Sequence, residues 1–430
     1  MKAAFYTLGC KVNQYETQAM REILKSNGYE IVSHDEKADI YIVNSCTVTA
    51  ASNQKTRQAV RNFKRQNPQG VVLLCGCMSQ AFPEQSQAIN EADIIIGNTD
   101  HKKIAVLLEK YFAERKRIIE ITPHLRGEKF ESTSITDFEE RTRAIIKIED
   151  GCDRYCSYCE IPFARGHVRS KPIEDLKNEA KLLADKGYKE IVLVGINLSA
   201  YKTDNGEDLG DAVVAVNSIE KIKRVRLGSL EPDHMSEEML SKFKQCEKFC
   251  PQFHLSLQSG CDKTLKNMNR HYDCDFYEDL CTRLRKSFDD ASITTDVMVG
   301  FPGENEEDFN ESLEFCKKIK FEKMHIFPYS VREGTRAAKM ENQVEKSVKT
   351  VRAKTLANTA EEIRREYLKS QIGKTVSVLF ERKRNDGYYE GYTKNYTPIK
   401  APSLSEIDGE IRDVKITHSD DDFCYAKVIE

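Results

Sequence analysis

Three closely spaced cysteines in the middle of the chain carry the strongest chemical signal. Cys152, Cys156 and Cys159 are separated by three and then two residues, directly after the apolar run 144–148. Three thiolates can hold three irons of a cubane 4Fe-4S cluster, and no further cysteine lies within the next 80 residues to bind the fourth iron. The spacing therefore predicts a strand that leads into a cluster loop with one iron open for chemistry.

Two other interpretations of this loop remain. Cys156 and Cys159 form a pair of the kind that binds zinc, but a structural zinc site needs a second pair or histidines, and His167 is the one candidate nearby. A disulfide is less favoured, because free cysteines in a chain without a secretory segment indicate a reducing compartment. The open cluster ranks first, zinc second and a disulfide third.

A second set of cysteines follows the first three predicted strands of residues 1–113. Apolar runs at 3–6, 39–43, 71–74 and 93–96, with helical patterns near 14–27, 52–66 and 100–113, are typical of a doubly wound parallel sheet. Cys10, Cys46 and Cys77 each follow one of these strands, at the sheet edge where ligands bind. They predict another 4Fe-4S cluster with a free iron; three unrelated buried cysteines are the alternative. Cys75 is assigned to the strand itself.

Length and composition limit the class of protein. A chain of 430 residues exceeds the size of one hydrophobic core, which predicts two or three domains. Charged residues make up 31% of the chain but balance to a net charge of −3, so any RNA contact must come from local patches. We expect a cytoplasmic protein without a membrane partner, since no signal peptide or membrane span is evident.

Strand and helix patterns alternate about six times from residue 144 to about 330. Predicted strands at 144–148, 190–194, 224–227, 253–257, 294–299 and 323–327 indicate a partial (βα)6 barrel with its site at the carboxyl ends of the strands. The polar candidates for cofactor binding at those ends are Gly195, Asn197, Glu231, Ser256, Gln258 and Asp296. Arg165 and Arg169, just past the cluster loop, are candidates to bind a carboxylate or an RNA phosphate.

The C-terminal part reads as a charged helix followed by short strands. A helical pattern over 345–371 precedes apolar runs at 375–380, 388–393, 411–417 and 424–429, which predict a small β-barrel of five strands. Arg382, Lys383 and Arg384 offer cations for RNA phosphates, and Tyr392 offers a face on which a base can stack.

The cluster loop, with the aromatic Tyr158 just before its third cysteine, resembles the motif of the radical S-adenosylmethionine enzymes. In that superfamily, S-adenosylmethionine chelates the open iron and is cleaved to a 5'-deoxyadenosyl radical that abstracts hydrogen from carbon. The resemblance implies that Tyr158 and the polar strand-end residues surround this cofactor. Residues 195–197 depart from the Gly-Gly-Glu form of the turn that contacts its amino group.

Segments 7–17, 44–49 and 76–80 resemble the three cysteine motifs of the methylthiotransferases, a family within that superfamily. The final unit resembles their RNA-binding barrel, called TRAM. The resemblance implies two 4Fe-4S clusters, S-adenosylmethionine, a tRNA partner and an electron donor of the flavodoxin or ferredoxin type. It implies no catalytic residues beyond the cluster ligands.

Segments 44–49, 257–262, 268–270 and 391–396 most resemble the branch that acts on threonylcarbamoyladenosine of tRNA. The implied reaction adds a methylthio group to carbon 2 of that base at position 37, with one S-adenosylmethionine as methyl donor and a second as radical source. Sibling branches act on isopentenyladenosine of tRNA or on an aspartate of a ribosomal protein. The alternative from another class is a non-catalytic, metal-stabilised RNA-binding protein.

These patterns together predict an α/β chain in five parts. An N-terminal methylthiotransferase domain over 1–113 and a linker over 114–143 precede a radical S-adenosylmethionine domain over 144–340. A bridging helix over 341–370 leads to the TRAM-like barrel over 371–430. We expect the chain to act as a monomer.

Overall fold

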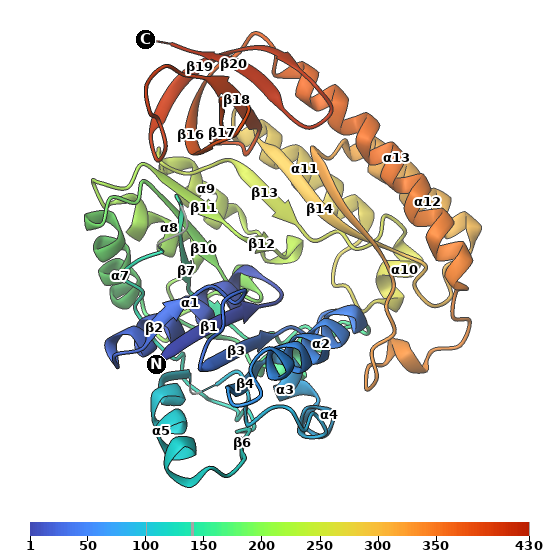
Figure 1. Ribbon diagram of the computed structural model, residues 1–430. Helices are drawn as coiled ribbons and strands as arrows, with labels where there is room; N and C mark the ends of the chain where they lie inside the picture. Colours follow the sequence, from blue (N-terminus) through green and yellow to red (C-terminus); the bar gives the residue numbers. More distant parts are fainter. Residues whose placement is uncertain (100, 139–141, 430) are drawn as a thin grey trace.

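The computed structural model describes residues 1–99, 101–138 and 142–429. Residue 100, where the third predicted helix begins, residues 139–141 of the predicted linker and residue 430 of the last predicted unit lie outside this range. Figure 1 shows an N-terminal sheet, a central half-barrel and a C-terminal barrel, with a long helix along one side. Among the helices described, none is a candidate for a membrane-spanning segment.

The N-terminal sheet has six parallel strands in the order β2-β1-β3-β4-β5-β6. The strands are β1 (Lys2–Thr7), β2 (Glu30–Val32), β3 (Ile40–Ser45), β4 (Val71–Gly76), β5 (Ile94–Ile96) and β6 (Ile118–Glu120). The edge strands β2 and β6 were not predicted, because three partly exposed residues give no readable periodicity. Strand β6 comes from the segment interpreted as a linker.

Helices cover both faces of this sheet, as the doubly wound prediction requires. They are α1 (Lys11–Ser26), α2 (Ala50–Gln66), α3 (Cys77–Ala81), α4 (Pro83–Gln87), the 3-10 turn η1 (His101–Lys103) and α5 (Ile104–Glu114). Alternate residues of β3 point to opposite faces: Ile40 and Ile42 pack in the core beneath α1 and α5, whereas Tyr41 and Val43 pack beneath α2. The predicted fold class is therefore confirmed for this part.

The central strands form the predicted partial barrel. They are β7 (Ala144–Lys147), β10 (Glu190–Val194), β11 (Arg224–Leu227), β12 (Ser229–Leu230), β13 (Gln252–Leu255), β14 (Ser292–Val299) and β15 (Lys323–Pro328). The strands form two hydrogen-bonded groups, in the orders β11-β10-β7 and β12-β13-β14-β15, and neighbouring strands in each group are parallel. A bridge between Val225 and Phe249 links the two groups of strands. The third barrel strand is thus broken into β11 and β12, with Gly228 between them.

Helices around the half-barrel and short elements at its ends complete the central part. The helices are α6 (Ile161–Arg165), α7 (Ile173–Asp185), α8 (Leu209–Asn217), α9 (Glu237–Gln245), α10 (Asp262–Asn267), α11 (Cys274–Ser287) and α12 (Glu306–Ile319). The short elements are β8 (Glu149–Asp150), β9 (Arg169–Ser170), η2 (Leu198–Ala200), η3 (Pro232–His234) and η4 (Ala337–Lys339). One continuous apolar core lies between strands and helices.

Helix α13 (Lys346–Ser370) leads into a closed barrel of five strands, as expected. The strands are β16 (Thr375–Lys383), β17 (Tyr388–Thr393), β18 (Pro398–Pro402), β19 (Ile411–Ser419) and β20 (Cys424–Val428). Strand β18 was not predicted as a strand because proline stands at both of its ends. Tyr389 is buried in the barrel core.

The C-terminal barrel packs against the amino ends of the half-barrel strands through buried charges (Figure 1). Arg226 pairs with Glu190 at 2.7 Å and donates to the Lys394 carbonyl of the barrel. Arg224, which is also fully buried, donates to the carbonyls of Ser377 and Tyr392. Glu190 therefore balances two guanidiniums that hold the barrel in place.

We expect Glu190→Gln to weaken this junction strongly, because it leaves two buried guanidiniums without their carboxylate. Breaking a buried pair on one side costs about 3–5 kcal/mol. The change should lower the urea midpoint and release a C-terminal fragment in limited proteolysis. Glu410→Gln, which breaks an exposed pair with Arg412, is the matched control and should cost less than about 1 kcal/mol. Equal effects of the two substitutions would contradict the role of Glu190 in holding the C-terminal barrel against the half-barrel.

Candidate functional site

The N-terminal cysteine set lies at the carboxyl ends of three neighbouring strands. Cys10 is the residue before α1, Cys46 follows β3, and Cys77 is the first residue of α3 after β4. Cys75 lies within β4 with its thiol facing the Val43 carbonyl in the core, as its assignment to the strand predicts. The sheet topology therefore brings together the three cysteines that the sequence singled out.

The three thiols of this set influence one another. Burial raises the pKa of all three, and each thiol also raises the pKa of another member through charge repulsion. The pKa of Cys77 rises to about 11. A side chain at Gly9 would place its Cβ 2.8 Å from Cys46 Cβ, and the φ angle there is +99°, so glycine is required for this close approach. Metal binding would have to displace protons from these thiols.

Two polar side chains face these sulfurs. Arg165 Nε donates to Cys77 Sγ at 3.1 Å, and Arg165 Nη2 donates to Asn13 Oδ1 at 2.6 Å. Asn13 Oδ1 is in turn 3.8 Å from Cys10 Sγ. Arg165 is fully buried, and a guanidinium stays protonated, so a fixed positive charge lies against one sulfur of the set.

A buried ion network surrounds Arg165 and joins the first sheet to the half-barrel. Glu16 of α1 pairs with Arg165 and with Lys147 of β7 at 2.8 Å. Asp150 lies 2.5 Å from Lys147, 3.5 Å from Arg165 and 3.4 Å from Arg169. Burial alone would raise the pKa of Glu16, but Arg165 and Lys147 hold it at about 2. Asn13, Glu16, Lys147 and Asp150 were not predicted as site residues, although Asn13 and Glu16 lie within segment 7–17, because only the fold brings their side chains to Arg165.

The second cysteine set occupies the loop between β8 and α6, as predicted. Hydrogen bonds from the Cys159 amide to the Cys156 carbonyl and from the Ser157 amide to the Met268 carbonyl fix the loop. Tyr155 takes a left-handed φ of +50°, which turns the chain between the first two cysteines. All three cysteines are partly exposed, and burial raises the pKa of Cys152 to about 12.

A second arginine lies against this set. Arg270 Nη1 is 3.3 Å from Cys156 Sγ, and Arg270 pairs with Glu231 at 2.5 Å and donates to the Ser256 carbonyl. Tyr158 packs edge-on against Phe301 beside it, with ring centres 6.5 Å apart. Each cysteine set thus has one buried arginine next to one sulfur. The sequence placed residues 268–270 in a family motif but assigned Arg270 no role.

The distances between the sulfurs of each cysteine set can be compared with those in a tetrahedral zinc site. Among the described residues, one group of three His, Cys, Asp or Glu has all its ligand atoms within 4.8 Å of one another, and it contains no cysteine. Tetrahedral zinc with Zn–S bonds of about 2.3 Å needs sulfurs about 3.8 Å apart. Neither cysteine triplet therefore has its three sulfurs as close together as a single zinc ion would hold them.

Comparison with known proteins identifies the family. Residues 2–97 match the family described as Uncharacterized protein family UPF0004, and residues 146–316 match the Radical SAM superfamily. The chain is 37% identical to the threonylcarbamoyladenosine tRNA methylthiotransferase MtaB of Bacillus subtilis, over 96% of this chain and 93% of that protein. The MtaB protein of Thermotoga maritima is 36% identical, over 99% and 97% of the two chains.

The chain belongs to the radical S-adenosylmethionine methylthiotransferase family. It is therefore a transferase that uses S-adenosylmethionine and an iron–sulfur centre. A tRNA-2-methylthio-N(6)-dimethylallyladenosine synthase of Clostridium perfringens is 33% identical, over 99% of this chain and 97% of that protein. The radical methyltransferase TsrM of Kitasatospora setae shares the fold, with a TM-score of 0.57 at 14% identity over 78% of this chain and 74% of that chain.

In this methylthiotransferase, two buried side-chain oxygens without a partner come from the turn after β10 and from β8. The Asn197 amide donates to Glu149 Oε2 at 2.7 Å, and a Cβ at Gly195 would lie 2.5 Å from that oxygen. Asn197 Oδ1 and Glu149 Oε1 are buried without a hydrogen-bond partner in the described chain. Buried acceptors of this kind suit a ligand that donates hydrogen bonds, such as the ammonium group of S-adenosylmethionine.

The remaining predicted cofactor residues of the methylthiotransferase follow β13 or lie on β14. Gln258 is buried with a φ of +67°, and its backbone bonds to both Asp296 and Met298. Ser256 uses its carbonyl to hold Arg270. Asp296 lies 3.2 Å from His254 Nε2. Gln258 and Asp296 are therefore joined by a backbone hydrogen bond, whereas Ser256 contacts Arg270.

The predicted RNA contacts divide into two groups. Arg382, Lys383 and Arg384 are exposed at the end of β16. Arg165 and Arg169 are held in the ion network, and a fully buried Arg165 cannot reach an RNA phosphate. Tyr392 stacks on Tyr396 with ring centres 4.4 Å apart at the junction with the half-barrel. The structure thus assigns Arg165 to the cysteine site and Tyr392 to interdomain packing.

We expect loss of Arg165 to lower the reduction potential of a cluster held by the N-terminal cysteines. Removing a positive hydrogen-bond donor from a cysteine sulfur favours the oxidised state. Arg165→Gln should lower the midpoint by up to roughly 65–130 mV, the one-electron equivalent of about 1.5–3 kcal/mol for one charge-assisted hydrogen bond. EPR-monitored titration of protein whose Cys152, Cys156 and Cys159 are replaced by alanine measures this cluster alone.

Two further variants complete that measurement. Arg165→Lys keeps the charge but loses the Nε–H donor, so its shift should be smaller. Arg61→Gln removes a half-exposed arginine on α2 and should leave the midpoint unchanged. An unchanged midpoint in Arg165→Gln would contradict the assignment of this residue to the cluster.

Proposed function

We propose that this methylthiotransferase adds a methylthio group to carbon 2 of threonylcarbamoyladenosine at position 37 of tRNA. The proposal includes two 4Fe-4S clusters and two molecules of S-adenosylmethionine, one as methyl donor and one as radical source. It rests on one observation above all: Arg165, six residues after Cys159, donates to Cys77 Sγ, so the segment that follows the second cysteine triplet lies against the first triplet. The MtaB names of relatives at 36–37% identity support the choice of base.

The cysteine sets divide the chemistry in this proposal. Cys10, Cys46 and Cys77 hold the cluster that carries the sulfur, and Cys152, Cys156 and Cys159 hold the cluster that binds S-adenosylmethionine. When bound, these groups supply methylation of sulfur and the radical that removes hydrogen from carbon 2. The chain itself supplies the fixed positive charges of Arg165 and Arg270 beside the thiolates.

Cofactor and base binding fall to the groups around the cluster loop. Asn197 and Glu149 provide free acceptors for the amino group of S-adenosylmethionine. Beside the loop lies a cavity of about 640 Å³, flanked by the exposed rings of Tyr155 and Phe163, which meet edge to face at 6.1 Å. Exposed aromatic faces are suited to stacking on unpaired bases of an RNA loop.

A second candidate substrate is isopentenyladenosine of tRNA. It is favoured by the dimethylallyladenosine synthases, which are 33% identical over almost the whole chain. Both substrates present the same carbon 2 of adenine and differ in the group on N6. The threonylcarbamoyl group carries a carboxylate, whereas the isopentenyl group is apolar.

Nucleoside mass spectrometry tests the proposal directly. Reconstituted protein with S-adenosylmethionine, inorganic sulfide as sulfur source, reductant and tRNA that lacks the 2-methylthio group should convert threonylcarbamoyladenosine to its 2-methylthio derivative. The protein should contain about eight irons, four for each cluster. A 2-methylthio product on isopentenyladenosine alone would select the second candidate. Tightly bound zinc with no release of 5'-deoxyadenosine would reject the enzyme altogether.

Cysteine variants separate the two proposed clusters. Cys152→Ala should abolish release of 5'-deoxyadenosine because the cofactor loses its cluster. Cys46→Ala should abolish the methylthio product but retain that release. Cys75→Ala is the matched control, since Cys75 lies in the strand two residues from Cys77, and it should retain product formation. Loss of cofactor cleavage in Cys46→Ala would contradict the division of labour.

Salt dependence tests the basic edge of the C-terminal barrel. We expect replacement of Arg382, Lys383 and Arg384 by glutamine to weaken tRNA binding and to reduce the salt slope by about 0.7–0.9 for each phosphate that the barrel no longer neutralises. Glu390 pairs with both arginines, so the reduction should correspond to fewer than three phosphates. Replacement of Arg412 and Lys415 on β19 serves as control; an equal reduction there would contradict the assignment.

A further inference from the structure

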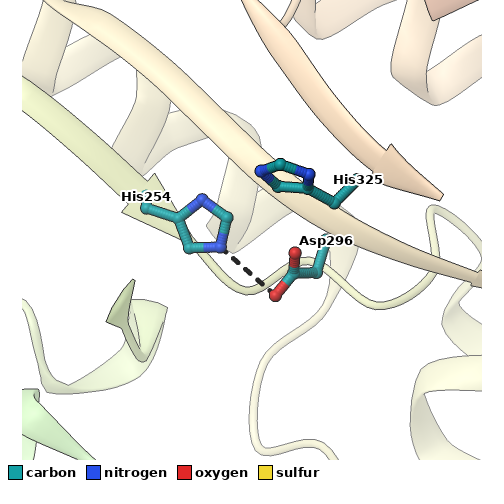
Figure 2. A group of neighbouring side chains, drawn as sticks. All are labelled: His254, Asp296 and His325. Carbon is teal, nitrogen blue, oxygen red and sulfur yellow. Dashed lines mark ion pairs between the residues drawn. The ribbon is translucent and has the colours of Figure 1, made fainter. Parts of the chain in front are cut away.

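Three metal-ligating side chains, none of them a cysteine, gather on the inner face of the half-barrel. His254 comes from β13, Asp296 from β14 and His325 from β15. Their ligand atoms all lie within 4.8 Å of one another, and His254 Nε2 is 3.2 Å from Asp296 Oδ2. Figure 2 shows the three side chains turned toward a common point from neighbouring strands.

The parallel sheet fixes this grouping. Asp296 pairs in register with His325, and His254 pairs with Thr294, two residues before Asp296. Side chains alternate along β14, so Thr294 and Asp296 share the inner face, while Thr295 turns outward and accepts from the Leu257 amide. The three ligands therefore stand side by side on rigid strands and not on loops.

A neighbouring hydroxyl orients the His254 imidazole. His254 Nδ1 lies 2.9 Å from Thr294 Oγ1, which also accepts from Gln252 at 3.2 Å, so the His254 ring is held with Nε2 toward Asp296. Metal-binding histidines commonly use their other nitrogen in this way. The His254 and Asp296 side chains are 15% and 29% exposed, so the group is open on one side.

We propose that His254, Asp296 and His325 form a binding site for a divalent first-row transition cation, separate from the cysteine-held clusters. Two imidazoles and one carboxylate on one side of an ion are the ligand set of non-haem iron(II) sites, and they leave positions open for a further ligand. Those positions face the inside of the half-barrel. In this proposal Asp296, which the sequence predicts to contact the cofactor, contacts it through this ion.

The competing arrangement is a simple hydrogen bond between His254 and Asp296 without a cation. It needs no contribution from His325 and predicts no stoichiometric metal. The two arrangements therefore differ in metal content and in the role of His325. Neither depends on which tRNA base is modified, so the outcome is independent of the proposed function.

Manganese(II) is a suitable probe for the reconstituted protein with its clusters present. It is visible by EPR, prefers nitrogen and oxygen ligands to thiolates, and replaces iron(II) in such sites. Titration should show one Mn²⁺ bound per chain, and electron spin-echo modulation should show two coupled imidazole nitrogens. Asp296→Asn, His254→Gln and His325→Gln should each weaken binding by at least about tenfold, and each histidine variant should lose one nitrogen coupling.

Controls keep this test decisive. His418→Gln removes a histidine of the C-terminal barrel and should leave Mn²⁺ binding unchanged. Iron content and circular dichroism show whether each variant is folded. If a variant fails to fold, the nitrogen couplings of the unaltered protein still show whether two imidazoles bind the Mn²⁺ ion. Absence of stoichiometric Mn²⁺, absence of nitrogen coupling, or full binding by His325→Gln would overturn the proposal.

Discussion

The buried ion network around Arg165 is the interaction on which the arrangement of this methylthiotransferase depends. Arg165 belongs to the helix after the cluster loop, yet its guanidinium lies among Asn13, Glu16 and Cys77 of the first sheet. Each buried charge loses several kcal/mol of hydration, so the network is stable only when all of its charges are paired. That requirement fixes the position of one cysteine set relative to the other.

The second cysteine set has the same arrangement of an arginine between a cysteine sulfur and a glutamate. Arg270 lies against Cys156 and is held by Glu231, as Arg165 lies against Cys77 and is held by Glu16. Thiolates bring negative charge into sites where water is scarce, and an adjacent guanidinium compensates it without being able to release a proton. The acidic partner holds each guanidinium beside its cysteine sulfur.

The half-barrel carries different partners at its two ends. The first sheet covers the carboxyl ends of its strands, where the cysteine loop lies, and the C-terminal barrel covers the amino ends through Glu190, Arg224 and Arg226 (Figure 1). Between these ends the inner face of β13, β14 and β15 carries His254, Asp296 and His325. The ends are fixed by buried charges, whereas the inner face keeps partly exposed ligands.

The sequence by itself determined the strands with continuous apolar runs, the sequence of N-terminal sheet, partial barrel and C-terminal β-barrel, and the positions of Cys10, Cys46 and Cys77 at the ends of predicted strands. These depend on local spacing and on the two-residue period of strands, which neighbours along the chain define. It did not reveal β2 and β6, which are too short to show a period, or β18, whose prolines mask it. Only the tertiary structure decided that Arg165 serves Cys77 and that Tyr392 packs between domains. The partners of Arg165 lie up to 152 positions away, and a buried charge is recognised only by the partners that folding brings to it.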